Sequence, residues 1–261
     1  MSAFFAINGV SKRFRGLLAV DRVSCEVAKG EIFAVIGPNG AGKTTLFNMI
    51  AGALRPDEGQ IAFQGERIEG LRPDEVCRRG IARTFQIVRP FPMLTVEDNV
   101  MVGALLRTPD VAHASAQTHE VMRRLDLFDK RGRVAKSLTL PDRKRLEVAR
   151  ALATSPQLLL LDEVMAGLRP TETDRMVAIL RELNAQGLTI LLIEHVMRAV
   201  MALASRVLVL HHGRVVAHDT VEQLRGTLSK GSLEEVFQQL VSEIDPAGTA
   251  RDLVNSMSLG G

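Results

Sequence analysis

The chain contains 261 residues with a mass of 28.5 kDa, enough for one large domain or for a domain with an inserted subdomain. Hydrophobic residues make up 46% of it and charged residues 24%, a composition that favours a globular protein with a sizeable core and excludes disorder as its main state. The net charge of only +3, with ten Phe and no Tyr or Trp, argues against a nucleic-acid partner, which requires a basic surface and often stacking aromatic rings.

The apolar stretches of the chain are short, which argues against a membrane-spanning protein. The densest, Leu188–Ile193 and Val207–Leu210, fall far short of the roughly 18–20 residues that a transmembrane helix needs. The first ten residues lack the features of a signal peptide, so we expect none. Cys25 and Cys77 form no metal-binding or redox spacing, which fits a reducing cytoplasm.

Strands and helices alternate through most of the chain, and this predicts an α/β fold around a largely parallel sheet. An apolar strand over Glu31–Ile36 leads into a glycine-rich loop, and a helix follows over Thr44–Ala51. Two hairpins are predicted, one from Gln60–Phe63 with Glu66–Ile68 and one from Val207–Leu210 with Arg214–Ala217. Two further buried strands are predicted over Leu158–Leu161 and Leu188–Ile193.

Two parts of the chain are predicted to lie outside this α/β core. A helical insertion over residues 93–155 begins with a capping box of Thr95 and Asp98 and continues in a helix over Glu120–Phe128. Residues 226–261 hold an amphipathic helix, with a capping box at Ser232 and Glu235, followed by a tail. We therefore expect a nucleotide-binding core of residues 1–92 and 156–225. The C-terminal helix either packs on this core, which we favour, or forms a dimer or partner surface.

The loop after the first buried strand has the pattern of a phosphate-binding loop. Gly37–Thr44 fits G-x-x-x-x-G-K-[ST] in full, with a strand before it and a helix after it. Glycines let the backbone wrap a phosphate, and the helix N-terminus directs amide dipoles at the anion. Lys43 is expected to reach the β- and γ-phosphates, and Thr44 to ligate Mg²⁺. The residues expected to bind ATP in this phosphate loop are Gly37, Pro38, Asn39, Gly40, Ala41, Gly42, Lys43, Thr44 and Thr45.

Two carboxylates follow the apolar strand Leu158–Leu161. A buried strand places Asp162 beside the phosphate loop, where it can hold the Mg²⁺ shell. Glu163 can then orient and polarise an attacking water, as a general base does. Taken alone, the strand and its acidic turn are a common surface feature; beside the phosphate loop they predict ATP hydrolysis.

In the order of these motifs, residues 4–225 resemble the ATP-binding subunit of ABC transporters. The resemblance implies a P-loop NTPase fold with a mixed, largely parallel core sheet, a small antiparallel β subdomain and an inserted helical subdomain. It also implies that Gln86 is a Mg²⁺-site residue that links this site to a membrane partner, and that His195 contacts the γ-phosphate. Phe14 stands where the family stacks adenine on an aromatic ring, a contact that needs only a π-face.

Within this family the chain is most similar to ATPases of branched-chain amino acid importers. The similar segments are Gly9–Phe14, Gly80–Gln86, Ala166–Leu168 and Ile190–His195. The resemblance implies a second ABC ATPase subunit, identical or paralogous, two integral membrane permease subunits and, indirectly, a periplasmic solute-binding protein. It places the chain at the cytoplasmic face of the inner membrane. Relatives that carry urea, amides or aromatic acids leave the substrate open.

The chain departs from the family at the signature segment, Leu138–Asp142, which the family uses to close on the partner's ATP. Thr139 keeps the usual hydroxyl and is expected to bind nucleotide. Pro141 lacks the amide N–H that a glycine supplies, and Asp142 is expected to add a negative charge at the partner's γ-phosphate. Both residues suit the first turn of a helix, so Asp142–Ala153 is predicted to be helical.

Other departures leave alternatives open. Val164 and Arg169 replace residues common in the family, and Ser232–Phe237 is similar to the tail of exporter-type ATPases. The chain is therefore either an import ATPase, an exporter-type ATPase, or a low-turnover regulatory partner in a heterodimer. A non-transport ABC ATPase is disfavoured, because the chain has one cassette and no long coiled-coil insertion. The basic run Arg143–Arg145 is predicted to be a solvated helix face.

Overall fold

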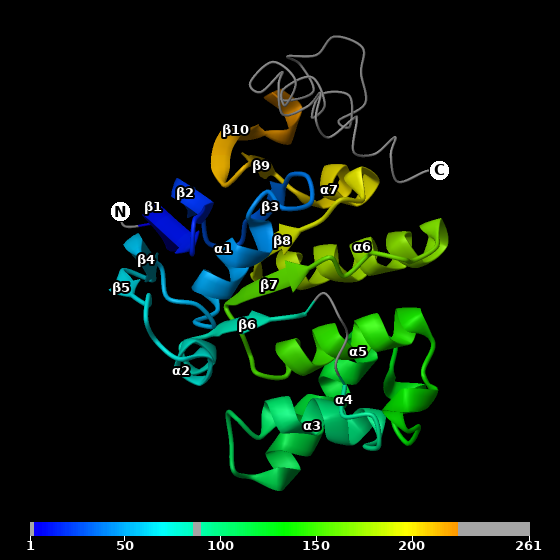
Figure 1. The fold of residues 1–261 in the computed structure, drawn as a ribbon. Coiled ribbons are helices and arrows are strands. Elements are labelled where there is room, and N and C mark those ends of the chain that lie inside the picture. Colours follow the sequence, from blue (N-terminus) through cyan, green and yellow to red (C-terminus); the bar gives the residue numbers. More distant parts are fainter. Residues whose placement is uncertain (1–2, 86–89, 224–261) are drawn as a thin grey trace.

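The computed structural model describes residues 3–85 and 90–223 (Figure 1). A four-stranded antiparallel sheet has the strand order β2-β1-β4-β5. Its strands are β1 (Phe5–Phe14), β2 (Leu17–Val27), β4 (Glu58–Phe63) and β5 (Glu66–Arg67). The predicted hairpin at residues 60–68 is confirmed, because β4 pairs with β5 in antiparallel register.

A six-stranded sheet forms the centre of the molecule, in the order β10-β9-β3-β8-β7-β6. Its strands are β3 (Ile32–Ile36), β6 (Ile81–Arg83), β7 (Leu158–Asp162), β8 (Thr189–Ile193), β9 (Arg206–His211) and β10 (Arg214–Thr220). All neighbours pair in parallel except β9 and β10. The central strands are apolar on both faces, as burial between two layers requires. The predicted mixed, largely parallel sheet is therefore confirmed.

Seven α-helices lie wholly within residues 3–85 and 90–223. They are α1 (Lys43–Ile50), α2 (Pro73–Arg78), α3 (Val96–Ala104), α4 (Val111–Arg124), α5 (Leu140–Leu152), α6 (Pro170–Ala185) and α7 (Met197–Leu203). Two 3₁₀ turns, Phe128–Lys130 and Ala135–Ser137, join α4 to α5. Helices α3, α4 and α5 gather at the lower end of the molecule, below the six-stranded sheet (Figure 1). Across residues 3–85 and 90–223, no helix combines the length and the apolar character required to span a membrane.

The helical region differs in detail from its prediction. The capping box is confirmed, since the Thr95 hydroxyl accepts the Asp98 N–H at 3.0 Å. The helix predicted over Glu120–Phe128 starts earlier, because Asp110 caps α4 and accepts the N–H of Ala112 at 2.9 Å. It also ends earlier, because Asp126 adopts a left-handed φ of 53° that a helix cannot contain.

The six-stranded sheet separates two hydrophobic cores. Along β3, Ala34 and Ile36 face one core, and Phe33 and Val35 face the other, because successive strand residues point to opposite faces. One core contains the inner faces of α3, α4, α5, α6 and α7; the other contains α1 and the antiparallel sheet. The first core runs continuously from the predicted helical insertion into β7 and β8, so the helices are packed directly on the sheet. The predicted C-terminal helix lies outside the described residues.

Candidate active site

The phosphate loop connects β3 to α1, as the sequence pattern predicts. The Lys43 ammonium is buried and donates to the carbonyl oxygens of Gly37 and Pro38, at 2.6 and 2.8 Å. Burial lowers the pKa of Lys43, and the charges of Glu163 and Asp162 oppose that shift. Lys43 is therefore already placed across the loop, within electrostatic reach of both acidic residues, while Asn39, Gly40 and Thr44 are exposed.

Two glycines of this loop are required by neighbouring strands as well as by a phosphate. A Cβ atom on Gly37 would lie 2.2 Å from the Leu210 carbonyl oxygen of β9, and one on Gly42 would lie 2.3 Å from the Ala19 carbonyl oxygen of β2. Both contacts are impossible for a real side chain. Sequence reasoning assigned these glycines to phosphate binding alone; the structure shows that they also let the loop pack between the two sheets.

Asp162 ends β7 with its carboxylate almost fully buried. One oxygen accepts a hydrogen bond from the Arg83 guanidinium at 2.8 Å, and the other has no partner among the described residues. Burial raises the pKa of Asp162, and the Arg83 hydrogen bond opposes this. A buried carboxylate oxygen without a partner fits a hard cation such as Mg²⁺, which prefers oxygen ligands and keeps several waters. Among the described residues, no group of three or more His, Cys, Asp or Glu side chains could hold a metal alone.

Glu163 and His195 follow adjacent parallel strands, so the sheet brings them together. Asp162 pairs with Ile193 in register, and the Glu163 N–H donates to the Ile193 carbonyl at 2.9 Å. The Glu163 carboxylate lies 3.9 Å from the Nδ1 atom of His195, which is exposed. The sequence assigned these two residues separate roles, and the structure places them side by side at the same sheet edge as Asp162.

Phe14 ends β1 with 42% of its surface exposed, as a stacking platform requires. The Lys12 ammonium lies 5.8 Å from the ring centroid. Strand β2, the partner of β1, carries the Ala19 carbonyl that packs against Gly42, so this antiparallel pair borders the phosphate loop. Gln86 lies outside the described residues. Its neighbour Phe85 is exposed, and the Phe85 N–H donates to the Glu147 carboxylate at 2.8 Å.

The signature segment leads into α5, which confirms the predicted helix. The expectation that Asp142 adds a negative charge at the partner's γ-phosphate is wrong, because this residue is only 3% exposed and its side chain faces inward. It accepts hydrogen bonds from Lys130 at 2.6 Å, from the Thr139 hydroxyl at 3.0 Å and from Arg145. Burial alone would raise the pKa of Asp142, but these donors hold it below its ordinary value. The segment therefore presents no free carboxylate, and the Thr139 hydroxyl is engaged within it.

The predicted solvated face at Arg143–Arg145 is also wrong in part. Arg143 is exposed, but Lys144 is 3% exposed and its ammonium donates to the Glu163 carbonyl oxygen at 2.9 Å. Helix α5 turns this residue inward because every third or fourth position of a helix faces the same way. Nothing in the local charge pattern marks Lys144 as buried; the sequence signal is the apolar Val148, four positions later on the same face of the helix and also buried.

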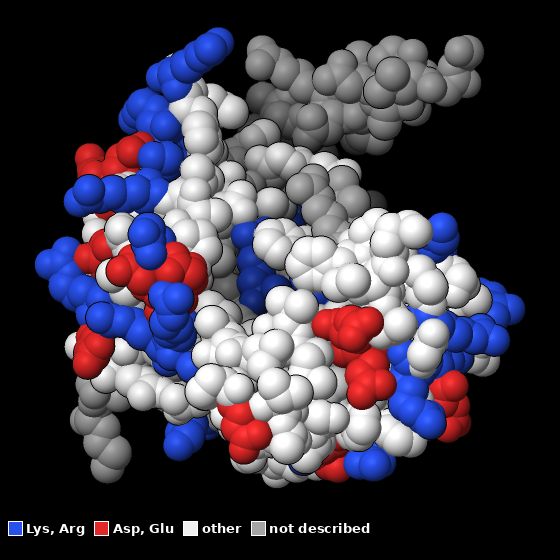
Figure 2. Space-filling model, turned by 90° about the horizontal axis from the view of Figure 1, so that it is seen from below, with Lys and Arg blue, Asp and Glu red and all other residues white. Residues whose placement is uncertain are grey.

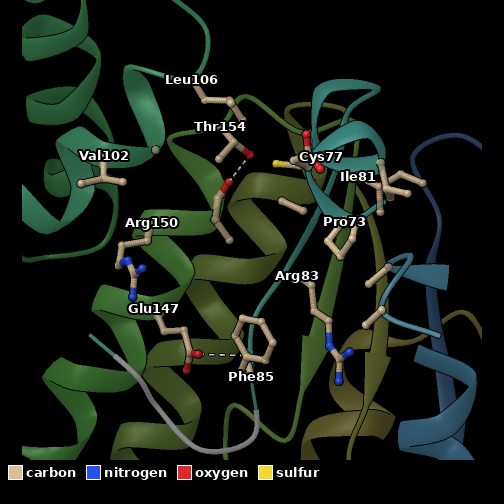
Figure 3. Close-up of a pocket in the computed structure, with 17 residues that line it drawn as sticks. Pro73, Cys77, Ile81, Arg83, Phe85, Val102, Leu106, Glu147, Arg150 and Thr154 are labelled. Carbon is tan, nitrogen blue, oxygen red and sulfur yellow. Dashed lines mark hydrogen bonds between the residues drawn. The ribbon is translucent and has the colours of Figure 1, made fainter. Parts of the chain in front are cut away.

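A largely apolar pocket of about 490 Å³ lies between α2, β6, α3 and α5 (Figure 3). Phe85, Val102 and Leu106 line it, and the carboxylate of Glu147 is at its base, bound to the Phe85 N–H. Burial raises the pKa of Glu147 to about 7. Seen from the α3 side, uncharged side chains cover most of the middle of the molecule and charged ones gather at its sides (Figure 2). Sequence analysis did not identify this pocket.

Comparisons with known proteins agree with this arrangement. Residues 20–166 match the family described as "ABC transporter". The high-affinity branched-chain amino acid transport ATP-binding protein LivG of Escherichia coli (strain K12) is 40% identical over 236 residues, covering 84% of this chain and 92% of LivG. The corresponding BraF protein of Pseudomonas aeruginosa is 37% identical over 84% of this chain and 92% of BraF. The lipopolysaccharide export system ATP-binding protein LptB of Acidithiobacillus ferridurans is 34% identical over 86% of this chain and 93% of LptB.

Solved structures show the same fold. A nucleotide-free ATP-binding cassette from an ABC transporter superposes with a TM-score of 0.81 at 29% identity, covering 90% of this chain and 99% of that one. The ADP conformation of an ATP-binding cassette of an ABC transporter gives a TM-score of 0.80 at 29% identity, covering 91% of this chain and 99% of that one. On its sequence match, its relatives and its fold, this chain belongs to the ABC transporter family.

Proposed function

We propose that this chain is the ATP-binding and ATP-hydrolysing subunit of an ABC transporter that energises the uptake of branched-chain amino acids or related small polar solutes. The observation that carries the proposal is the meeting of Lys43, Asp162, Glu163 and His195 at one edge of the six-stranded sheet. The 40% identity to LivG supports the substrate class.

Each residue at this edge has a role that its chemistry suits. The Lys43 ammonium exchanges its bonds to the loop carbonyls for bonds to the β- and γ-phosphates of ATP. The backbone N–H groups of Asn39–Thr45 and the N-terminus of α1 neutralise the remaining phosphate charge. Phe14 stacks on adenine. Thr44, Asp162 and Gln86 would hold Mg²⁺, which neutralises charge that develops on the transferred phosphoryl group.

Hydrolysis requires a water positioned in line with the bond that breaks. Glu163 accepts a proton from this water or orients it, and its carboxylate is partly exposed toward the sheet edge. His195 is the adjacent donor to the γ-phosphate, 3.9 Å from that carboxylate. Glu163 activates the water and His195 stabilises the negative charge of the γ-phosphate, so this chain supplies both groups beside its own phosphate loop.

We propose three kinds of partner. A second ABC ATPase subunit, identical or paralogous, apposes its signature segment to this phosphate loop. Integral membrane permease subunits dock at the apolar pocket beside Phe85, since Phe85 directly precedes Gln86 in the sequence and the pocket offers exposed Val102 and Leu106 to an apolar helix. A periplasmic solute-binding protein acts through the permease. This assembly places the chain at the cytoplasmic face of the inner membrane.

Two alternatives have specific support. An exporter-type role is supported by the 34% identity to LptB. A low-turnover regulatory role is supported by Pro141, which removes an amide donor from the signature segment. Reconstitution with the permease subunits distinguishes these roles: uptake of labelled leucine favours import, and ATP turnover only with a paralogous ATPase favours the regulatory role.

The first test is Mg-ATP turnover by the purified chain, compared with Glu163→Gln. Turnover by the wild type and its loss in the variant support a self-sufficient ATPase. If both proteins bind ATP and neither turns it over, the chain needs a partner's signature segment. Failure of both to bind ATP would overturn the proposed function.

A further inference from the structure

The turn that carries Glu163 has an unusual backbone. Glu163 adopts a φ of 50°, a left-handed conformation that is unfavourable for a non-glycine residue. Such a conformation persists only where the surroundings determine it. The Glu163 N–H is tied to Ile193 of β8, and its carbonyl oxygen accepts the Ala166 N–H at 3.2 Å. Two buried charged side chains also hydrogen-bond to the backbone of this turn.

Lys144 and Glu194 bind this turn from different parts of the fold. Lys144, one turn into α5, donates to the Glu163 carbonyl at 2.9 Å. Glu194 directly follows β8, and its Oε1 atom accepts the Met165 N–H at 2.9 Å. Lys144 is 3% exposed and Glu194 is 1% exposed. Burial raises the pKa of Glu194 to about 7, and the positive charge of Lys144 partly opposes this shift.

Stability alone does not account for this pair. Replacing buried charged groups with apolar side chains of similar volume is often neutral or stabilising, because burying a charge is costly. Here both charges are directed at the backbone of a single turn, and that turn positions the carboxylate expected to orient water. A misplacement of about 1 Å in such a group can cost up to about a hundredfold in rate.

We propose that Lys144 and Glu194 are positioning residues for ATP hydrolysis, which hold the Glu163 turn in its left-handed conformation and so aim the Glu163 carboxylate. This inference rests on the proposed function. Because Lys144 lies on the helix that the signature segment begins, it also connects Glu163 mechanically to the part of the chain that faces a second subunit.

The test compares side chains that keep the hydrogen bond with side chains that lose it. Lys144→Gln keeps an N–H donor and Glu194→Gln keeps an acceptor oxygen. Lys144→Met and Glu194→Met have similar volume and supply neither. We expect kcat for Mg-ATP to fall about ten- to a hundredfold in each Met variant, with the KM for ATP within about twofold of wild type. Each Gln variant should keep kcat within about threefold. Arg143→Met, one position away and exposed, is the matched control and should resemble wild type.

Two further variants protect the test against misfolding and indirect effects. The double variant Lys144→Met/Glu194→Met leaves no unpaired buried charge, so it should fold and still show the low kcat. In a Glu163→Gln background, Lys144→Met should add no further loss, because it acts through Glu163. A wild-type kcat in the folded Met or double variants would overturn the proposal, as would equal losses in the Gln and Met variants or a further loss in the Glu163→Gln background. Absent turnover in the wild type would instead overturn the proposed function and this inference with it.

Discussion

The phosphate loop and the signature segment are both expected to contact ATP, yet in this chain they differ in how well they match the family pattern and in which groups they leave exposed. In the phosphate loop every position fits the pattern, Lys43 is in place, and the exposed residues are free to meet a ligand. In the signature segment Pro141 lacks a backbone N–H, and the Thr139 hydroxyl donates a hydrogen bond to the Asp142 carboxylate. The difference supports the proposal that the phosphate loop serves this chain's own ATP site, while the signature segment offers a second subunit a reduced set of donors.

The largest effect that we predict concerns this chain's own ATP site. Glu163→Gln should lower Mg-ATP turnover by about a hundredfold or more, because it removes the general base. ATP affinity should change little, since the phosphate loop is untouched. Turnover and nucleotide binding measured on the same preparation check both parts. Normal turnover in the variant would show that the acidic edge of the sheet is not the hydrolytic site.

The next effect concerns the stability of the signature segment. Asp142→Asn should lower the free energy of unfolding by about 2 kcal/mol at neutral pH, because it weakens charged hydrogen bonds to Lys130 and Arg145. The pKa of Asp142 lies below its ordinary value of 3.8, so its contribution is present above pH 3.8 and is lost as the pH falls through the folded-state value.

Denaturant unfolding of Asp142→Asn at pH 7 and in acid checks this sign. The two proteins should converge in stability below the folded-state pKa of Asp142, provided both remain folded there. Arg143→Asn, an exposed neighbour on α5, serves as the control and should change little. A difference that stays constant with pH would contradict the ion-pair interpretation.

A smaller effect concerns adenine binding at this chain's own ATP site. Phe14→Ala should weaken ATP binding about tenfold, the loss expected for one base stacked on one ring. Leu17→Ala, on the same hairpin and 69% exposed, should bind ATP normally. Titration of both variants with ATP and with inorganic triphosphate sharpens the result, because triphosphate has no base and should bind both equally. Equal ATP affinity in the two variants would remove Phe14 from the site.

The smallest predicted effect concerns the altered donor set. Pro141→Gly and Pro141→Ala both restore a backbone N–H, and each should raise turnover of the assembled dimer about threefold, the value of one added hydrogen bond. Alanine is the stricter test, because it avoids the helix penalty of glycine. Unchanged turnover in both would show that Pro141 does not weaken the site, and the contrast between the two segments would lose its functional meaning.

Local patterns predicted much of this protein. The strand-loop-helix at residues 31–51, both hairpins and the capping box at Thr95 follow from short-range periodicity and turn chemistry, and the structure confirms them. One error was local, because the start of α4 depends on the Asp110 cap, a signal that the sequence analysis did not use. Another came from a contact farther along the chain, because the burial of Asp142 depends on Lys130, twelve residues away.

The sequence by itself determined the family and the α/β class, and it predicted the phosphate-binding and acidic residues, because all of these depend on ordered short motifs. Only the tertiary structure decided which side chains meet. It placed Glu163 beside His195 through the pairing of β7 with β8, and it directed the buried Lys144 and Glu194 at one turn. A sequence motif depends on residues only a few positions apart. The direction of a buried charged side chain instead depends on which elements, far apart in the chain, pack around it.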